Sequence, residues 1–146
     1  MKVYLDMCSI QRPLDSQGDI RVATEAQAVL GVLRLCESGQ VTLVGSDAVL
    51  FELERNPHPL RKDYAAVVLS KAAAFTATDR RVEARAREFE ETGMKPLDAL
   101  HLASAVEAEA DFFCTCDDRL LKRAREAETG RTRVVSPLEL VTEVSR

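Results

Sequence analysis

Hydrophobic and polar positions along this chain alternate between short apolar runs and longer segments with helical spacing. The apolar runs predict strands at 2–5, 41–45, 111–115 and 132–135. Apolar residues that recur at the spacing of a helix predict helices at 20–37, 47–55, 59–74, 78–93, 96–105 and 118–128. The polar stretch 7–19, with its proline and glycine, is predicted to be a loop.

Capping residues mark several of these boundaries. Ser46 is placed to cap the helix at 47–55, and Gly39 to end the helix at 20–37. Ser136 and Glu139 fit a capping box around Pro137, which predicts a final helix there. Strands separated by helices indicate parallel pairing in an α/β fold with a sheet covered on both faces. Without linkers or repeats, residues 1–146 are expected to form a single domain.

Composition narrows the classes of protein. Hydrophobic residues make up 46% of the chain and charged residues 30%, as in ordinary globular proteins. The net charge of −4 gives no overall attraction to nucleic acid, so any such binding needs a local basic patch. No apolar run could span a membrane, and the opening residues lack a signal-peptide core. We therefore expect a cytoplasmic protein with reduced thiols, in which Cys114 and Cys116 pack rather than bind zinc.

Four acidic residues fall where a parallel sheet exposes its carboxyl ends. Asp6 and Asp117 directly follow strands, Glu52 lies in the helix after the second strand, and Asp98 begins a helix. Each has an ordinary structural interpretation. Asp6 and Asp117 suit turns or helix caps, Glu52 suits an exposed helix face, and Asp98 suits the positive end of a helix dipole.

Convergence of these acids would carry a chemical consequence. Two carboxylates 4 Å apart repel by about 4 kcal/mol at an effective dielectric near 20. Raised pKa values or a bound divalent cation would relieve that repulsion. Carboxylate oxygens suit Mg²⁺ or Mn²⁺, which activate water for attack on a phosphodiester. The chain lacks phosphate-cradling glycine motifs and a nucleophile elbow. His101 is one turn after Asp98 and is expected to be a packed histidine or to orient that carboxylate.

Four segments resemble those of PIN-domain proteins and occur in the same order. They are "VYLD", "SDAVLFELERNP", "PLDALHLASA" and "FFCTCDDRLL", and the pairing of "DALHLA" with "TCDDRLL" is the most specific part. The resemblance implies a three-layer α/β/α sandwich with a central parallel sheet and a Mg²⁺- or Mn²⁺-dependent ribonuclease. It implies four catalytic and metal-binding acids, which here are Asp6, Glu52, Asp98 and Asp117.

The resemblance also implies partners. Many small members of the family are toxins of type II toxin–antitoxin pairs, inhibited by an antitoxin encoded beside them, and many form homodimers. The chain departs from the family pattern at one position. Next to the first aspartate, where the family usually has a small polar residue, this chain has Met7, so Cys8 or Ser9 would supply the contact of that polar residue. Glu54 and Asp118 neighbour two of the assigned acids. Since Glu54 lies about 200° around the helix from Glu52, only one of them can face the site, and we favour Glu52.

The sequence also suggests residues that contact RNA. Arg12, Ser9 and Thr115 are close along the chain to the assigned acids. Basic residues near the same edge are candidates for backbone contacts: Arg12, Arg55, Arg119, Lys122 and Arg123. Two other interpretations stay open. One is a catalytically silent PIN-like module that binds a protein, supported by Met7. The other is a different Mg²⁺-dependent phosphoryl-handling enzyme, for which Thr115 is available but a suitable lysine is not.

Overall fold

The computed structural model describes all residues, 1–146, as five strands and eight α-helices. The strands are β1 (Lys2–Leu5), β2 (Thr42–Ser46), β3 (Ala74–Thr76), β4 (Phe112–Cys114) and β5 (Arg133–Val135). The helices are α1 (Met7–Gln11), α2 (Ile20–Glu37), α3 (Asp47–Glu54), α4 (Pro59–Ser70), α5 (Arg80–Glu91), α6 (Pro96–Glu107), α7 (Asp118–Glu126) and α8 (Pro137–Val144). A short 3₁₀ helix covers Arg12–Leu14.

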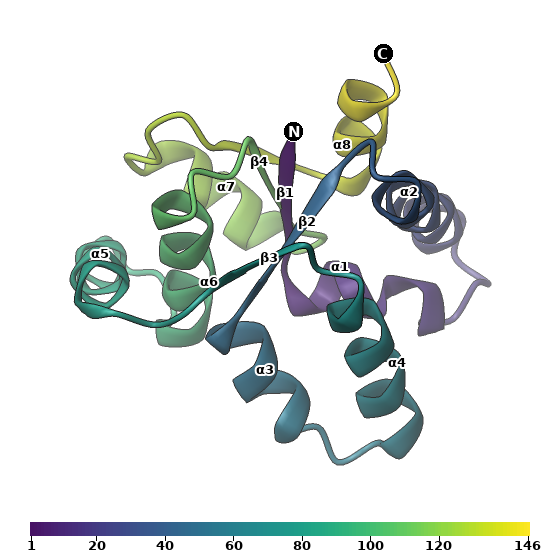
Figure 1. Cartoon of the computed structure of the whole chain (residues 1–146), viewed down its shortest axis with the longest axis horizontal. Helices are drawn as coiled ribbons and strands as arrows, with labels where there is room; N and C mark the ends of the chain where they lie inside the picture. The colour runs from purple at the N-terminus through teal and green to yellow at the C-terminus, as the bar shows by residue number, and fades with distance from the viewer.

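All five strands are parallel and lie in the order β3-β2-β1-β4-β5. Helices α6 and α7 cover one face of the sheet, with α5 packed on the outer side of α6, and α2 and α8 lie on the other face (Figure 1). This is the three-layer α/β/α sandwich that the sequence resemblance implies. No helix has the length and apolar character needed to cross a membrane.

Two segments differ from the sequence prediction. The helix expected to reach residue 74 ends at Ser70, and β3 forms beyond it. An alanine run, Ala72–Ala74, continues the helical pattern into β3, and Phe75 in the middle of the strand is exposed, so no apolar run marks it. The expected loop at 7–19 contains α1 and the 3₁₀ helix. Helix α1 is only five residues long, so it carries no helical repeat that a periodicity argument could detect.

The predicted capping residues do cap helices. The Ser46 hydroxyl accepts a hydrogen bond from the Val49 amide at 3.1 Å at the start of α3. At the start of α8, Ser136 and Glu139 exchange both hydrogen bonds of a capping box. These bonds satisfy amide groups that a helix leaves without partners in its first turn.

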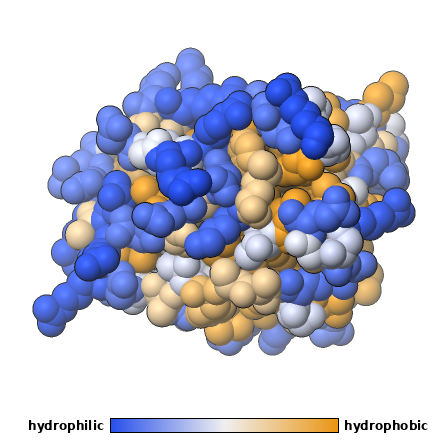
Figure 2. All heavy atoms as spheres, turned by 45° about the horizontal axis from the view of Figure 1, so that its top comes forward, coloured by the Kyte–Doolittle hydropathy of each residue, from blue (hydrophilic) through white to orange (hydrophobic).

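The core lies between the sheet and the helices on each side. The rings of Tyr4 and Phe113, on neighbouring strands, stack with centroids 5.6 Å apart. Helix α6 presents small buried residues, including Ala99, Ala103 and Ala105, which let it approach the sheet closely. Cys114 is a free, buried cysteine, in agreement with its predicted packing role. Hydrophilic residues cover most of the molecular face in Figure 2, with hydrophobic groups scattered between them.

Gly45 in β2 is required by close packing against the segment that leads into β3. A Cβ atom at this position would lie 2.7 Å from Leu69 Cδ1 and 3.2 Å from Ala72 Cβ. We expect Gly45→Ala to reduce the free energy of unfolding by about 1–3 kcal/mol, because overpacking forces its neighbours apart. Gly31 in α2 has only an ordinary contact, at 3.6 Å from Val141. Gly31→Ala should raise stability through helix propensity, and urea unfolding of both variants checks the opposite signs.

Candidate active site

The four predicted acids line one cavity of about 100 Å³. Its lining residues are Asp6, Met7, Cys8, Glu52, Asp98, His101 and Asp117. The cavity lies at the carboxyl ends of β1 and β4, which are neighbours in the sheet. From β1 the chain proceeds to β2 and β3 on one side, and later to β4 and β5 on the other. A parallel sheet opens a crevice where its strand order reverses in this way, which explains the position of the cavity.

Asp6 and Asp117 cap helices while they line the cavity. Asp6 Oδ1 accepts a hydrogen bond from the Ser9 amide at 3.1 Å at the start of α1. Asp117 Oδ1 accepts from the Arg119 and Leu120 amides at 2.9 and 3.2 Å at the start of α7. The capping interpretation and the site interpretation therefore hold together. Each cap fixes one carboxylate oxygen and so orients the other.

A chain of buried hydrogen bonds positions Glu52. His101 Nε2 lies 2.7 Å from Glu52 Oε1, and His101 Nδ1 lies 2.7 Å from the Tyr4 hydroxyl. The Tyr4 hydroxyl is also 2.6 Å from Ser46 Oγ. Because a carboxylate only accepts hydrogen bonds, His101 donates from Nε2 and, when neutral, accepts from Tyr4 at Nδ1. His101 thus joins β1 and α6 to the Glu52 side chain on α3.

Burial and like charge disfavour ionisation at this cavity. Burial raises the pKa of Asp6, although Thr115, His101 and Cys8 partly offset that rise. The pKa of Asp98 is raised first by burial and then by the carboxylates of Asp6 and Asp117. Asp98 forms no ion pair, and no lysine or arginine lines the cavity. The charges of His101 and Lys95 lower the pKa of Asp98, but the net effect is still a rise.

The donor set suits a hard divalent cation. All four acids offer carboxylate oxygens, the ligands that Mg²⁺ and Mn²⁺ prefer. Asp98 makes no hydrogen bond, and Asp117 commits only Oδ1 to its cap. No three of the acids, cysteines or histidines already converge in a metal-binding arrangement in this structure. The fit to a cation is one of ligand chemistry and charge.

Glu54 and Asp118, the acidic neighbours of Glu52 and Asp117, do not line the cavity. Glu54 is exposed and does not line the cavity, whereas Glu52 does. Asp118 is exposed and forms a bidentate ion pair with Arg21, with oxygens 2.6 and 2.8 Å from the guanidinium. Of each pair, only Glu52 and Asp117 line the cavity.

The residues beside Asp6 supply the polar contact that Met7 does not. The Cys8 thiol donates to the Asp6 carboxylate at 3.2 Å, and the Ser9 amide supplies the capping bond. Met7 itself is almost fully buried at the cavity wall. The departure from the family pattern at Met7 therefore leaves Asp6 hydrogen-bonded.

The predicted substrate contacts lie apart from the cavity surface. Ser9 is fully buried, and its hydroxyl donates to the Cys114 carbonyl at 3.1 Å. Arg12 is held by Asp15 at 3.1 Å and by Glu25 at 2.7 Å. Thr115 is also buried, and its hydroxyl accepts from the Asp117 amide. These placements correct the expectation that Ser9, Arg12 and Thr115 contact substrate: in this structure Ser9 and Thr115 support the acids and Arg12 is neutralised.

Sequence reasoning missed the role of His101 toward Glu52. The spacing along α6 pointed only to Asp98, which lies three residues before His101. The actual partners, Tyr4 and Glu52, come from β1 and α3. A contact across three elements leaves no local pattern in the sequence.

A comparison of the chain with protein families finds one match. The family model described as PIN domain matches residues 19–126, well over half of the chain. Glu52, Asp98 and Asp117 lie within the matched residues. Asp6 lies before them and joins the other three acids through the pairing of β1 with β4. None of the curated proteins is similar enough to this chain to match it.

Proposed function

Because this chain belongs to the PIN domain family, whose members are generally nucleases, we propose that it hydrolyses RNA phosphodiester bonds with Mg²⁺ or Mn²⁺. The observation that carries the proposal is the single cavity lined by four carboxylates and by no lysine or arginine. Such a cavity accumulates negative charge, which a divalent cation would neutralise.

In this proposal Asp6, Asp98 and Asp117 hold the cation, and Glu52 completes the site or orients the attacking water. A divalent cation supplies a water of lowered pKa and offsets charge on the leaving oxygen. The helix caps hold Asp6 and Asp117 in fixed orientations. His101 Nε2 holds one carboxylate oxygen of Glu52. This hydrogen bond fixes the orientation of the carboxylate and therefore of its second oxygen.

Finer parts of the proposal rest on the family resemblance. We propose a cytoplasmic toxin of a type II toxin–antitoxin pair, with a cognate antitoxin and a homodimeric state. A small neighbouring gene that encodes a DNA-binding antitoxin would support the toxin role. Size-exclusion chromatography with light scattering measures the number of chains in the particle.

We expect purified protein to cleave single-stranded RNA with Mn²⁺ and to lose this activity in EDTA. Glu52→Gln should reduce the rate at least about tenfold, because it removes a negative charge from the cavity and weakens the contact to His101. Glu54→Gln is the matched control, since it makes the same change two residues away on the exposed side of α3. Gel analysis of a labelled RNA measures both rates.

Two results would contradict this proposal or one of its residue roles. If neither Mn²⁺ nor Mg²⁺ supports cleavage and neither cation raises the melting temperature, the nuclease proposal is wrong. The catalytically silent, protein-binding module then becomes the better interpretation. Equal rates for Glu52→Gln and Glu54→Gln would instead remove Glu52 from the site.

A further inference from the structure

A second cavity, of about 460 Å³, lies against α7 and the end of α5. We call it the basic cleft, and its lining residues are Thr92, Arg119, Lys122, Arg123, Glu126 and Ala127. Arg119, Lys122, Arg123 and Glu126 follow the i, i+3, i+4, i+7 spacing of one helix face. One face of α7 therefore forms a wall of the cleft.

The charge of the cleft is opposite to that of the whole chain. Three cationic side chains face one acid, in a protein whose net charge is −4. Arg119 and Lys122 are exposed and form no ion pair or side-chain hydrogen bond. Many other arginines are neutralised by acids, as Arg21 is by Asp118 and Arg125 by Glu139. Unpaired cations grouped in a cavity favour an anionic ligand.

Arg123 gives the cleft a fixed wall. Its guanidinium donates to the Thr92 carbonyl at 2.8 Å and so ties α7 to the end of α5. The bond passes over Gly93, whose φ is +98°. A Cβ atom at Gly93 would overlap Arg123 Nη1, so this approach requires glycine.

Both walls of the basic cleft are joined along the chain to residues that line the carboxylate cavity. Asp117 caps α7 and accepts a hydrogen bond from the amide of Arg119. On the other wall, the turn after Thr92 leads into α6 and to Asp98 in its first turn. Lys122 follows Asp117 by five residues, which is about 8 Å along the helix axis. A strand held at the carboxylates can continue along these cations.

We propose that the basic cleft binds the sugar–phosphate backbone of single-stranded RNA beside the bond that is cut, an inference that rests on the proposed nuclease function. Phosphates are the ligands that unpaired arginine and lysine side chains recognise. The cleft has no aromatic lining residue on which a base could stack. It therefore contributes affinity and strand placement, and it does not select a base sequence.

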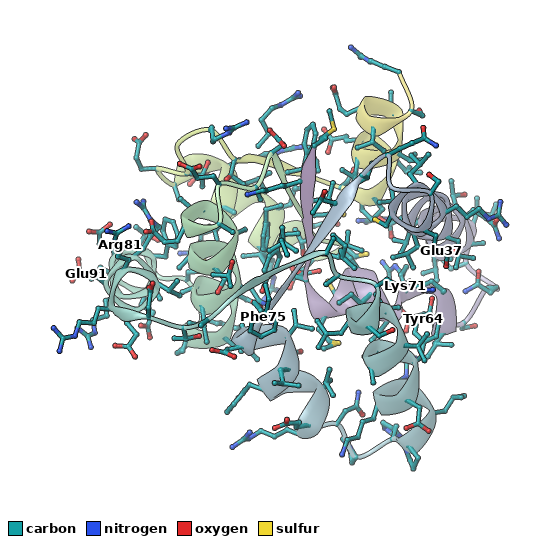
Figure 3. All side chains as sticks on the ribbon, viewed as in Figure 1. Glu37, Tyr64, Lys71, Phe75, Arg81 and Glu91 are labelled. Atoms are coloured by element: carbon teal, nitrogen blue, oxygen red, sulfur yellow. The ribbon has the colours of Figure 1, made fainter.

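The test is the affinity for a short, fluorescein-labelled, single-stranded oligouridylate, measured by fluorescence anisotropy. The protein carries Asp98→Asn and the buffer contains EDTA, so that no strand is cut during the titration. Arg119→Glu is compared with Arg81→Glu, since each is an exposed arginine at the second position of a helix capped by aspartate. Arg81 is labelled on the outer helix α5 (Figure 3). It lies about 16 Å along that helix from the cleft.

Arg119→Glu should weaken binding about tenfold, which corresponds to about 1.4 kcal/mol. It should also lower the slope of log K against log salt by about 0.7 for each phosphate that the variant no longer neutralises. Lys122→Ala should have a smaller effect in the same direction. Arg81→Glu changes the net charge equally and should leave the affinity within about twofold. Unchanged circular dichroism and melting temperatures establish that the variants fold.

Equal weakening by Arg119→Glu and Arg81→Glu would overturn the inference, because the effect would then be one of net charge. Absence of oligouridylate binding by the parent protein would overturn it as well. If binding depends on Arg119 and Lys122 but the wild-type protein never cleaves RNA with Mn²⁺, the proposed function fails. The basic cleft then stands as an RNA-binding surface.

Discussion

Asp98→Asn should reduce the rate of RNA cleavage about a hundredfold or more and should raise the melting temperature of the metal-free protein. The rate falls because the substitution removes a charged oxygen ligand from the proposed site. Stability rises because ionised Asp98 is half-buried and repelled by Asp6 and Asp117, and the charges of His101 and Lys95 offset this only in part. Loss of activity combined with gain of stability is the signature of a side chain retained for chemistry.

The pH dependence of this gain follows from the direction of the Asp98 pKa shift. Its pKa is higher in the folded protein than in the unfolded chain, so the folded state binds the proton more tightly. The wild type therefore loses stability as the pH rises through this raised pKa. The stability difference between Asp98→Asn and wild type should grow over the same interval and then level off. Thermal melts between acidic and neutral pH, in EDTA, measure it.

A different result would support the ordinary interpretation of Asp98. If Asp98→Asn lowers the melting temperature and leaves cleavage intact, the carboxylate serves only the dipole of α6. Mn²⁺ supplies a second readout. At a hundredfold excess over its dissociation constant, it should stabilise the wild type by about 2.7 kcal/mol, and it should stabilise the variant much less.

His101→Phe should lower both the stability and the turnover number. It leaves Glu52 without its buried donor and removes one of two partners of the Tyr4 hydroxyl. Loss of buried hydrogen bonds costs about 1–3 kcal/mol. For a chain of this length that corresponds to a fall in melting temperature of about 5 °C. Turnover should fall because Glu52 is no longer oriented, whereas KM for RNA should change little.

A conservative variant separates positioning from packing at this histidine. His101→Gln retains an amide donor near the place of Nε2, so it should recover part of the turnover that is lost in His101→Phe. Both variants can be compared at a temperature where each is fully folded, as judged by circular dichroism. Should His101→Phe melt early but turn over RNA at the wild-type rate, His101 is only a packed core residue.

The sequence predicts the fold wherever an element is long enough to show its period. The bounds of α2, expected at 20–37, agree with the structure, as does the start of α8 at Pro137. The failures are α1 and β3, with five and three residues. In those elements tertiary contacts contribute to the conformation: Gln11 of α1 donates to the Arg61 carbonyl of α4 at 2.8 Å, and pairing with β2 holds β3.

The candidate site also has features that the sequence predicts and features that it does not. Asp6 and Asp117 could be placed because Asp6 directly follows β1 and Asp117 comes three residues after β4, and parallel strands bring their carboxyl ends to one edge. The hydrogen bond between His101 and Glu52 could not, because it depends on the depth at which α6 packs against β1 and α3. From chain position alone, Arg12 and Arg119 are equal candidates for contacts with the RNA backbone. Only the structure distinguishes Arg12, which Glu25 neutralises, from Arg119 in the basic cleft.

The hydrogen bond between Arg123 and Thr92 also restricts the substitutions that homologous chains can carry at nearby positions. Any side chain at position 93 would occupy the space of the Arg123 guanidinium, and the positive φ of Gly93 adds to the constraint. We therefore expect substitutions at Gly93, before α6, to be coupled to substitutions at Arg123 on α7. Among homologous chains, loss of this glycine should accompany loss of this arginine, and natural selection would act on the two positions jointly.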